Sequence, residues 1–243
     1  MSQVRVLGVD IDPVERKTMI PSVVALHEAG TPATISYVNA HVLNQVQKHA
    51  VLRDFLTTAD LVYCDGNGVR LGARLLGQTI PARMTGADWI WDLAAHAEGR
   101  WRIYWIGGKA GVAAQAAATL QARHPRLSIQ TDHGFHDRTG HADAASIRRI
   151  NAYEPDILLV GMGTPEQERW VHERRHKLNV PIVWCLGATA DGLAGLEKRG
   201  PRWLVDRAEW VFRLGQNPAL LWRRYLIGNP MFMARILRQR IRD

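Results

Sequence analysis

Several glycine-rich segments of this sequence place polar side chains directly after short apolar runs, where α/β proteins commonly bind and transform small molecules. The first, Asp65-Gly66-Asn67-Gly68, follows the apolar run Leu61–Cys64. An aspartate at the end of a strand is placed to act as a general base or to accept a hydrogen bond from a sugar hydroxyl. The glycines allow a close approach of backbone to ligand. A structural interpretation, Asp65 as a helix N-cap before a tight turn, fits the same four residues.

The second segment, Gly161-Met162-Gly163-Thr164-Pro165-Glu166-Gln167-Glu168, also follows an apolar run. Gly161 and Gly163 favour a loop that lies close to a ligand, and the helix after the proline has amides that could receive a phosphate or sugar oxygen. The third glycine of a dinucleotide-binding fingerprint is absent, which argues against an NAD-dependent oxidoreductase. A structural strand-to-helix turn explains the glycines and the proline, but it explains Gln167 and Glu168 less well.

Two more loops have the same character. Gly107-Gly108-Lys109-Ala110-Gly111 lacks the spacing and the Lys-Ser/Thr pair of a Walker loop. We expect Gly107 and Gly108 to lie under a nucleotide diphosphate at a helix start, with a plain turn as the alternative. In Gly187–Gly192 the one carboxylate, Asp191, is expected to contact a ribose, a sugar or a base, unless it is a structural cap.

Histidines and cysteines do not form a metal-binding pattern. The spacing of His133, His136 and His141 matches no helical zinc pair, and a solvated loop is the preferred interpretation. Cys64 and Cys185 lie far apart in apolar runs, which argues against a disulfide framework or a structural zinc site and fits a reducing cytosol. We therefore expect no metal site.

The elements that must carry these loops are short β-branched apolar runs that alternate with helical patterns. This alternation predicts a Rossmann-like α/β fold with a mostly parallel sheet flanked by helices. The predicted strands are Val4–Val9, Ala33–Val38, Leu61–Cys64, Arg102–Ile106, Ser128–Thr131, Ile157–Gly161 and Ile182–Leu186. The predicted helices are Pro13–Ala29, Ala40–Leu56, Asn67–Leu76, Ala87–Ala97, Gly111–Arg123, Ala142–Tyr153 and Pro165–Leu178.

Charge divides the 243 residues into two parts. Residues 1–197 contain 20 basic and 20 acidic side chains, whereas residues 198–243 contain 11 basic and three acidic ones, so the formal charge of +8 lies in the last 46 residues. We predict an α/β catalytic domain over 1–197 and a basic, Trp/Arg-rich helical appendage over 198–243. Such an asymmetry indicates a polyanionic partner for the C-terminal part.

Arginine beside aromatic residues on amphipathic helices suits the headgroup region of an anionic membrane. Nucleic acid is the rival partner, but no nucleic-acid-binding motif occurs and the apolar content is high, so we expect no nucleic-acid partner. An ordinary packed helical subdomain is the third interpretation. The N-terminus has no signal-peptide pattern and the chain has no run of about 18 apolar residues, which predicts a peripheral rather than a spanning protein.

Taken in order, the motifs resemble those of the bacterial WecG/TagA/CpsF glycosyltransferase family over nearly the whole chain. No single motif is specific, but their order and spacing together are. The resemblance rests on Asn39, Asp65-Gly66-Asn67-Gly68-Val69, Arg83 with Thr85-Gly86-Ala87-Asp88, Gly107-Gly108, Asp132 to Phe135, Gly161 to Glu168, Lys198-Arg199-Gly200-Pro201, and Glu209-Trp210 with Arg213.

The resemblance implies an inverting, cofactor-free and metal-independent transfer of a hexose from a UDP-sugar to an undecaprenyl-diphosphate-linked saccharide, on the cytoplasmic face of the bacterial inner membrane. The catalytic residues would be Asp65 as general base, Arg83 to stabilise departing UDP, and Gln167 to hydrogen-bond a sugar. The expected substrate-binding residues are Asn39, Gly66, Asn67, Gly107, Gly108, Gly161, Gly163, Asp191, Arg213, Arg223 and Arg224.

Family members differ in whether they transfer glucose, N-acetylmannosamine or its uronic acid. The Asn39-Ala40-His41 segment favours UDP-glucose and a β-linkage in exopolysaccharide assembly, with the other two sugars as alternatives. This sequence departs from the family at Tyr37, where members often have threonine. A noncatalytic, membrane-associated nucleotide-sugar-binding protein is the alternative from another functional class. The resemblance also implies self-association.

Overall fold

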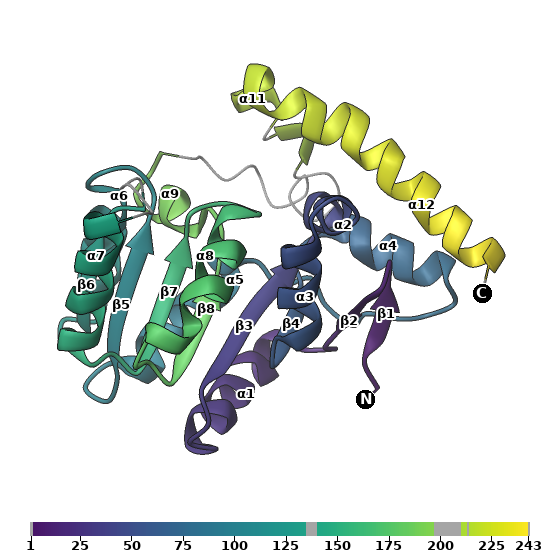
Figure 1. The fold of residues 1–243 in the computed structure, drawn as a ribbon. Coiled ribbons are helices and arrows are strands. Elements are labelled where there is room, and N and C mark those ends of the chain that lie inside the picture. The colour runs from purple at the N-terminus through teal and green to yellow at the C-terminus, as the bar shows by residue number, and fades with distance from the viewer. Residues whose placement is uncertain (1, 135–139, 197–209, 213, 243) are drawn as a thin grey trace.

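The computed structural model describes residues 2–134, 140–196, 210–212 and 214–242. Within them, six parallel strands form one sheet in the order β4-β3-β8-β7-β5-β6 (Figure 1). This arrangement confirms the predicted Rossmann-like α/β fold. The strand bounds are β3 Ala33–Val38, β4 Leu61–Cys64, β5 Arg102–Gly107, β6 Ser128–Asp132, β7 Ile157–Gly161 and β8 Ile182–Cys185.

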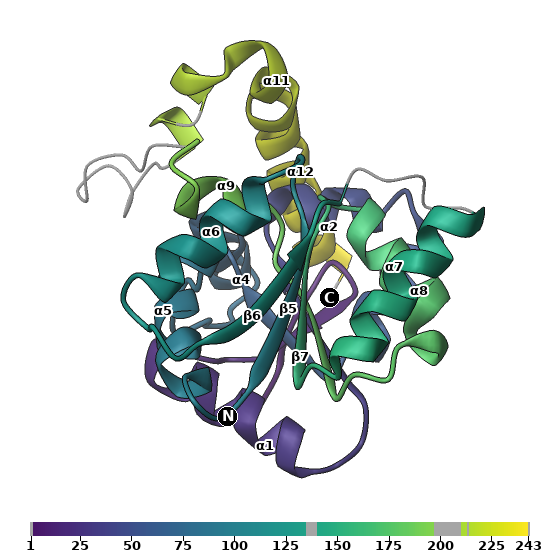
Figure 2. The same ribbon diagram turned by 90° about the vertical axis from the view of Figure 1, so that its left-hand side faces the viewer.

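Helices cover both faces of this sheet. On one face α1, α5, α6 and α9 pack against one another, and α3 packs against α8 on the other, beside α7 (Figure 2). The helices after the neighbouring strands β5 and β7 therefore lie on opposite faces, which marks a topological switch point of the kind that binds ligands. The helix bounds are α1 Arg16–Glu28, α2 Ala40–Val46, α3 Ala50–Thr58, α4 Asn67–Leu75, α5 Gly86–Ala97, α6 Val112–Gln121, α7 Gly140–Tyr153, α8 Glu166–Arg174, α9 Thr189–Leu193, α11 Pro218–Trp222 and α12 Gly228–Arg242. A 3₁₀ turn, η1, spans Arg175–Lys177, and a π turn, η2, spans Arg223–Ile227.

The N-terminal segment differs from its prediction. The single strand expected over Val4–Val9 is a separate antiparallel hairpin of β1 (Val4–Val6) and β2 (Val9–Ile11). Leu7 and Gly8 both adopt positive φ, at 49° and 87°, which is the backbone of a two-residue hairpin turn. The prediction was wrong because the apolar pattern runs through this turn and leucine rarely adopts positive φ.

The helix predicted over Ala40–Leu56 is likewise two helices, α2 and α3. The break falls at His49, whose extended backbone (φ −123°, ψ 107°) precedes α3. The amide N–H of Lys48 donates to the carbonyl of Gln45 at 2.9 Å, in a tight turn that ends α2. Helix α2 begins at the edge of the sheet that carries the motifs, directly after β3. Because it is short, it stays close to that edge.

An aromatic cluster supports the strands beneath the motif-bearing edge. Trp89 of α5 stacks on Trp184 of β8 with ring centroids 3.8 Å apart, and Tyr63 of β4 meets both rings edge-on. The Trp184 indole N–H donates to the Tyr63 hydroxyl at 3.3 Å. These fully buried rings fix β4, β8 and α5 against one another.

The C-terminal helix α12 is part of the same packed body. It lies along α2 and α4 (Figure 1), and its Phe232 and Ile236 are buried in the core. A Cβ on Gly72 of α4 would lie 3.0 Å from the ring of Phe232, so glycine allows the two helices this close approach. The side chain of Gln239 accepts a hydrogen bond from the Leu7 amide at 2.9 Å, which ties α12 to the N-terminal hairpin.

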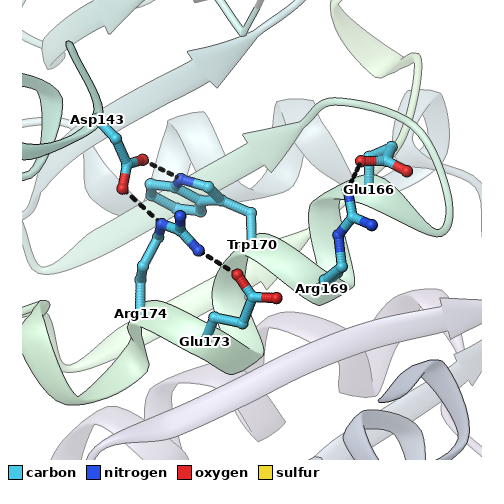
Figure 3. A network of polar contacts seen from close by, with 6 residues as sticks. All are labelled: Asp143, Glu166, Arg169, Trp170, Glu173 and Arg174. Atoms are coloured by element: carbon cyan, nitrogen blue, oxygen red, sulfur yellow. Dashed lines mark hydrogen bonds and ion pairs between the residues drawn. The ribbon is translucent and has the colours of Figure 1, made fainter. Parts of the chain in front are cut away.

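Helix α8, which carries Gln167 and Glu168, is held by a polar network with α7. The Asp143 carboxylate accepts hydrogen bonds from the Trp170 indole at 2.7 Å and from Arg174 Nε at 2.6 Å (Figure 3). Asp143 is buried, and these donors satisfy both of its oxygens. A buried carboxylate needs such partners, because an unpaired one costs several kcal/mol.

Candidate active site

Asp65 and Asn39 follow the neighbouring strands β4 and β3 and meet at the carboxyl edge of the sheet. The Asp65 amide N–H donates to the Val38 carbonyl at 2.8 Å, and Asn39 Nδ2 lies 3.5 Å from Asp65 Oδ2. Asn39 Oδ1 accepts the Val42 amide at 3.0 Å and caps α2. This cap fixes the orientation of the carboxamide, so its NH₂ group faces the Asp65 carboxylate.

Arg83 lies beside this pair because its loop is bonded to the end of β4. The Met84 amide donates to the Cys64 carbonyl at 2.8 Å. Arg83 directly precedes Met84 and Asp65 directly follows Cys64, so both lie next to this hydrogen bond. The Arg83 side chain is only 12% exposed, with Nη2 lying 3.9 Å from Asp88 Oδ2. Burial raises the pKa of the Cys64 thiol to about 12; the Asp65 charge adds to the rise, and the charges of Arg70 and Arg83 oppose it.

Gly66 and Asn67 form the turn into α4. Gly66 has φ +139°, and a Cβ there would lie 3.5 Å from the Cβ of Asn39. A positive φ of this kind is strained for any residue with a side chain, so glycine is required here. Asn67 is the first residue of α4 and is half-buried beside Asp65.

Gln167 and Glu168 form a buried hydrogen-bond network that joins β7 to β8. Gln167 Nε2 donates to Glu168 Oε1 at 2.6 Å, and Gln167 Oε1 accepts the Gly187 amide at 3.1 Å. Thr164 donates its hydroxyl to the same Glu168 oxygen at 2.9 Å. Both ends of the Gln167 amide are therefore used inside the protein, and the side chain is fully buried. The expectation that Gln167 hydrogen-bonds a sugar does not fit this arrangement, in which Gln167 positions two loops.

Tyr37 is a site residue that the sequence analysis did not place in the site. Its hydroxyl lies 3.4 Å from Thr164 Oγ1, and a Cβ on Gly187 would lie 2.6 Å from it. Burial raises the pKa of Tyr37; Glu168 and Asp65 add to the rise, and Arg224 opposes it. The one available signal was a tyrosine, with its polar hydroxyl, near the end of a predicted strand and two residues before Asn39.

The glycines of the β5 and β7 loops serve backbone packing. A Cβ on Gly107 would lie 2.4 Å from the Gly161 carbonyl oxygen, and one on Gly161 would lie 2.7 Å from the Gly187 carbonyl oxygen. The Gly108 amide donates to Gly161 at 3.0 Å. Close packing of neighbouring strand ends therefore explains Gly107 and Gly161 better than the expected direct contact with a ligand does. Gly163, by contrast, is exposed with φ +80° and has open space around it.

The remaining predicted residues lie at the two sides of this edge. Asp191 is half-buried on α9, which packs on α5 and α6. Arg223 is exposed, with its guanidinium 5.2 Å from the Trp222 ring centre. Arg224 lies close enough to α2 for its charge to act on His41, whose pKa falls to about 4 through burial first and then through Arg224 and Lys48. Arg213 lies outside the described residues.

Together these side chains form a row along the carboxyl edge of the sheet. Asp65 follows β4 and the Gly161 loop follows β7, three strands away in the sheet order. At the usual strand spacing this separation is about 14 Å. An elongated polar row of this length suits a long ligand such as a nucleoside diphosphate sugar better than a small one. Among the described residues, no three His, Cys, Asp or Glu side chains gather as metal ligands would.

Glu168 gives this site a pH-dependent stability. Burial raises its pKa to about 7, while the hydrogen bonds from Gln167 and Thr164 oppose the rise. Its second oxygen, Oε2, is buried with no hydrogen-bond partner in the described part of the chain. Between pH 4.5, its ordinary pKa, and about 7 the folded state binds more protons than the unfolded state, so stability falls as pH rises through this window.

We expect the free energy of unfolding to fall by about 2.5 kcal/mol more in the wild type than in Glu168→Gln between about pH 5 and pH 8. The glutamine keeps the acceptor oxygen and cannot ionise. Urea denaturation at both pH values measures the difference, and Glu166→Gln on the same helix is the matched control. Equal pH dependence in the wild type and Glu168→Gln would show that Glu168 does not titrate in this range.

Comparison with known proteins agrees with the geometry. The model of the family described as "Glycosyl transferase WecG/TagA/CpsF family" matches residues 4–243. Similar curated proteins include two from Staphylococcus aureus, strains NCTC 8325 / PS 47 and MRSA252, each 26% identical to this chain. Each alignment covers 97% of this chain and 92% of the relative. Both relatives are named N-acetylglucosaminyldiphosphoundecaprenol N-acetyl-beta-D-mannosaminyltransferase.

Proposed function

This chain belongs to the WecG/TagA/CpsF family of glycosyltransferases, and from that premise we propose that it transfers N-acetylmannosamine from a UDP-linked donor to N-acetylglucosaminyl-diphosphoundecaprenol. The names of the relatives support this donor and this acceptor. They give no support to the glucose donor that the Asn39-Ala40-His41 segment suggested. The observation that carries the proposal is the pairing of Asp65 with Asn39 at one end of a long polar row.

Asp65 acts as general base in this proposal. An inverting transfer needs a carboxylate that takes the proton of the acceptor hydroxyl while the nucleotide leaves from the opposite face of the sugar. The NH₂ group of Asn39 faces one Asp65 oxygen at 3.5 Å and helps to orient the carboxylate.

Arg83 and Arg224 supply positive charge for the diphosphate. UDP carries negative charge that grows as the bond to the sugar breaks, and fixed cations stabilise this charge best where water is excluded. Arg83 is largely buried beside Asp65, and Arg224 approaches the same edge from the C-terminal segment. Gln167 and Glu168 hold the β7 and β8 loops between them, so their effect on the sugar is indirect.

A test of the proposed function offers the purified protein a panel of UDP-sugars with a detergent-dispersed N-acetylglucosaminyl-diphospho-polyprenol and measures UDP release. We expect release with UDP-N-acetylmannosamine and not with UDP-glucose. Release with UDP-glucose alone would overturn the donor assignment. Tight UDP binding with no release from any donor would favour a noncatalytic nucleotide-sugar-binding protein.

The C-terminal segment suits a position on the cytoplasmic face of the membrane, where such an acceptor would be met. Leu226, Leu237 and Ile241 are 55%, 49% and 86% exposed, an uncommon concentration of large apolar side chains on one segment. The same segment carries the arginines Arg223, Arg238, Arg240 and Arg242. No helix among the described residues is both long and apolar enough to cross a bilayer.

We expect Leu237→Glu combined with Ile241→Glu to weaken binding to vesicles that contain anionic lipid by at least about tenfold. Both residues lie one helical turn apart on α12, and burying one large apolar side chain in the bilayer interface contributes about 1.5–3 kcal/mol. Vesicle co-sedimentation measures the effect. Val51→Glu, an exposed position on α3, is the control, and unchanged binding of the double variant would remove the membrane role of α12.

A further inference from the structure

The segment between α11 and α12 is a π turn, which changes the direction of the side chains before it. In η2, Arg223–Ile227, the Gly228 amide donates to the Arg223 carbonyl, five residues back. A π turn inserts one extra residue into a helix, and one residue corresponds to about 100° of rotation in an α-helix. Relative to α12, the arginines at 223 and 224 therefore point about 100° away from where an uninterrupted helix would aim them.

Asn44 of α2 holds this turn in place. Its side chain is buried, and its Nδ2 donates to the Gly228 carbonyl at 2.7 Å. Asn44 Oδ1 accepts from Arg235 Nη1, which also donates to the Asn44 carbonyl at 3.3 Å. Gly228 is thus fixed twice, because its N–H closes the π turn and its C=O is bonded to α2.

Arg224 lies opposite the other end of α2. Burial is the largest cause of the lowered pKa of His41, and the charge of Arg224 lowers this pKa further. The same charge opposes the rise in the pKa of Tyr37. The Arg224 Nε is buried without a hydrogen-bond partner among the described residues. Helix α2 therefore has Gly228 against Asn44 near its end. The charge of Arg224 acts on His41 near its start, and Asn39, which caps this start, faces the Asp65 carboxylate.

We propose that Asn44 is a positioning residue: by holding Gly228 it keeps the π turn in register, and the turn aims Arg224 at the diphosphate of the bound nucleotide sugar. The proposal rests on the proposed function for the identity of the ligand. The placement of Arg224 by Asn44 does not depend on it. Asn44 itself lies on the far part of α2 from Asp65 and touches no reacting group.

The kinetic and binding test uses Asn44→Leu in the full chain. The leucine is uncharged and close to asparagine in size, but it can neither donate to the Gly228 carbonyl nor accept from Arg235. We expect the Kd for UDP and the KM for the donor to rise about tenfold to a hundredfold, the size of a lost charge-assisted contact. Arg224→Ala is expected to do the same, and the double variant no more than Arg224→Ala alone. Additive effects would overturn the proposal.

A second readout works without turnover or ligand. The ring signal of His41, identified by its loss in His41→Gln, is titrated by NMR. In Arg224→Ala and in Asn44→Leu the pKa of His41 should rise toward its ordinary value, because the nearby positive charge is gone or displaced and neither substitution adds a charge of its own. Deleting Leu226, which turns the π turn into an α turn, should also raise it, and Leu226→Ala should not. A His41 pKa unchanged in Asn44→Leu would contradict the proposal even if the enzyme were active on another substrate.

Discussion

Asp65→Asn is expected to lower the rate of sugar transfer about 10²- to 10⁴-fold while leaving UDP affinity within about twofold. The amide has the size of the carboxylate and can still receive a hydrogen bond from Asn39 Nδ2, but it cannot take the proton of the acceptor hydroxyl. Steady-state UDP release gives the rate, and isothermal titration calorimetry gives the affinity. A pure binding module has no rate to lose.

The matched control for this prediction is Asp54→Asn, an exposed aspartate on α3, which should change neither quantity. If Asp65→Asn retained a tenth or more of the wild-type rate, another group would be the base. If UDP affinity fell in parallel with the rate, Asp65 would serve ligand binding and the general-base assignment would be wrong.

Arg83→Ala is the second change with a large expected effect, a loss of about 10²- to 10³-fold in the rate. The guanidinium is largely buried. In the proposed function it stabilises charge on the departing UDP, which is greatest in the transition state. The KM for the donor should rise less than the rate falls. Single-turnover measurements with saturating donor separate the two quantities.

Arg83→Lys keeps the charge but not the planar fork of donors, so we expect it to restore only part of the loss. Arg126→Ala, an exposed arginine beside Glu98, is the control and should behave as the wild type. A rate in Arg83→Ala that is unchanged at saturating donor would assign Arg83 to binding of the ground state alone.

The sheet could be predicted from the sequence because its strands are short, β-branched and buried on both faces, as Ile157–Gly161 and Ile182–Cys185 are. The meeting of Asp65 and Asn39 also followed from a simple rule. Residues that follow parallel strands gather at one edge of the sheet. Arg83 follows no strand, and only the family resemblance selected it; its loop is bonded to the end of β4.

The details that differ depend on three-dimensional packing. Gln167 carries polar atoms that suit a sugar, yet Glu168 and Gly187 take both ends of its amide in the core. The π turn before α12 follows from the bond between Asn44 and Gly228, which are far apart in the sequence. Side-chain type and spacing along the chain do not encode such long-range partners.

The most direct test of the account is to identify the lipid product formed from UDP-N-acetylmannosamine and N-acetylglucosaminyl-diphospho-polyprenol by mass spectrometry and NMR. We expect an acceptor extended by one N-acetylmannosamine, with the anomeric configuration inverted relative to the donor, in the wild type and not in Asp65→Asn. A product with retained configuration, or the same product yield from Asp65→Asn, would contradict it.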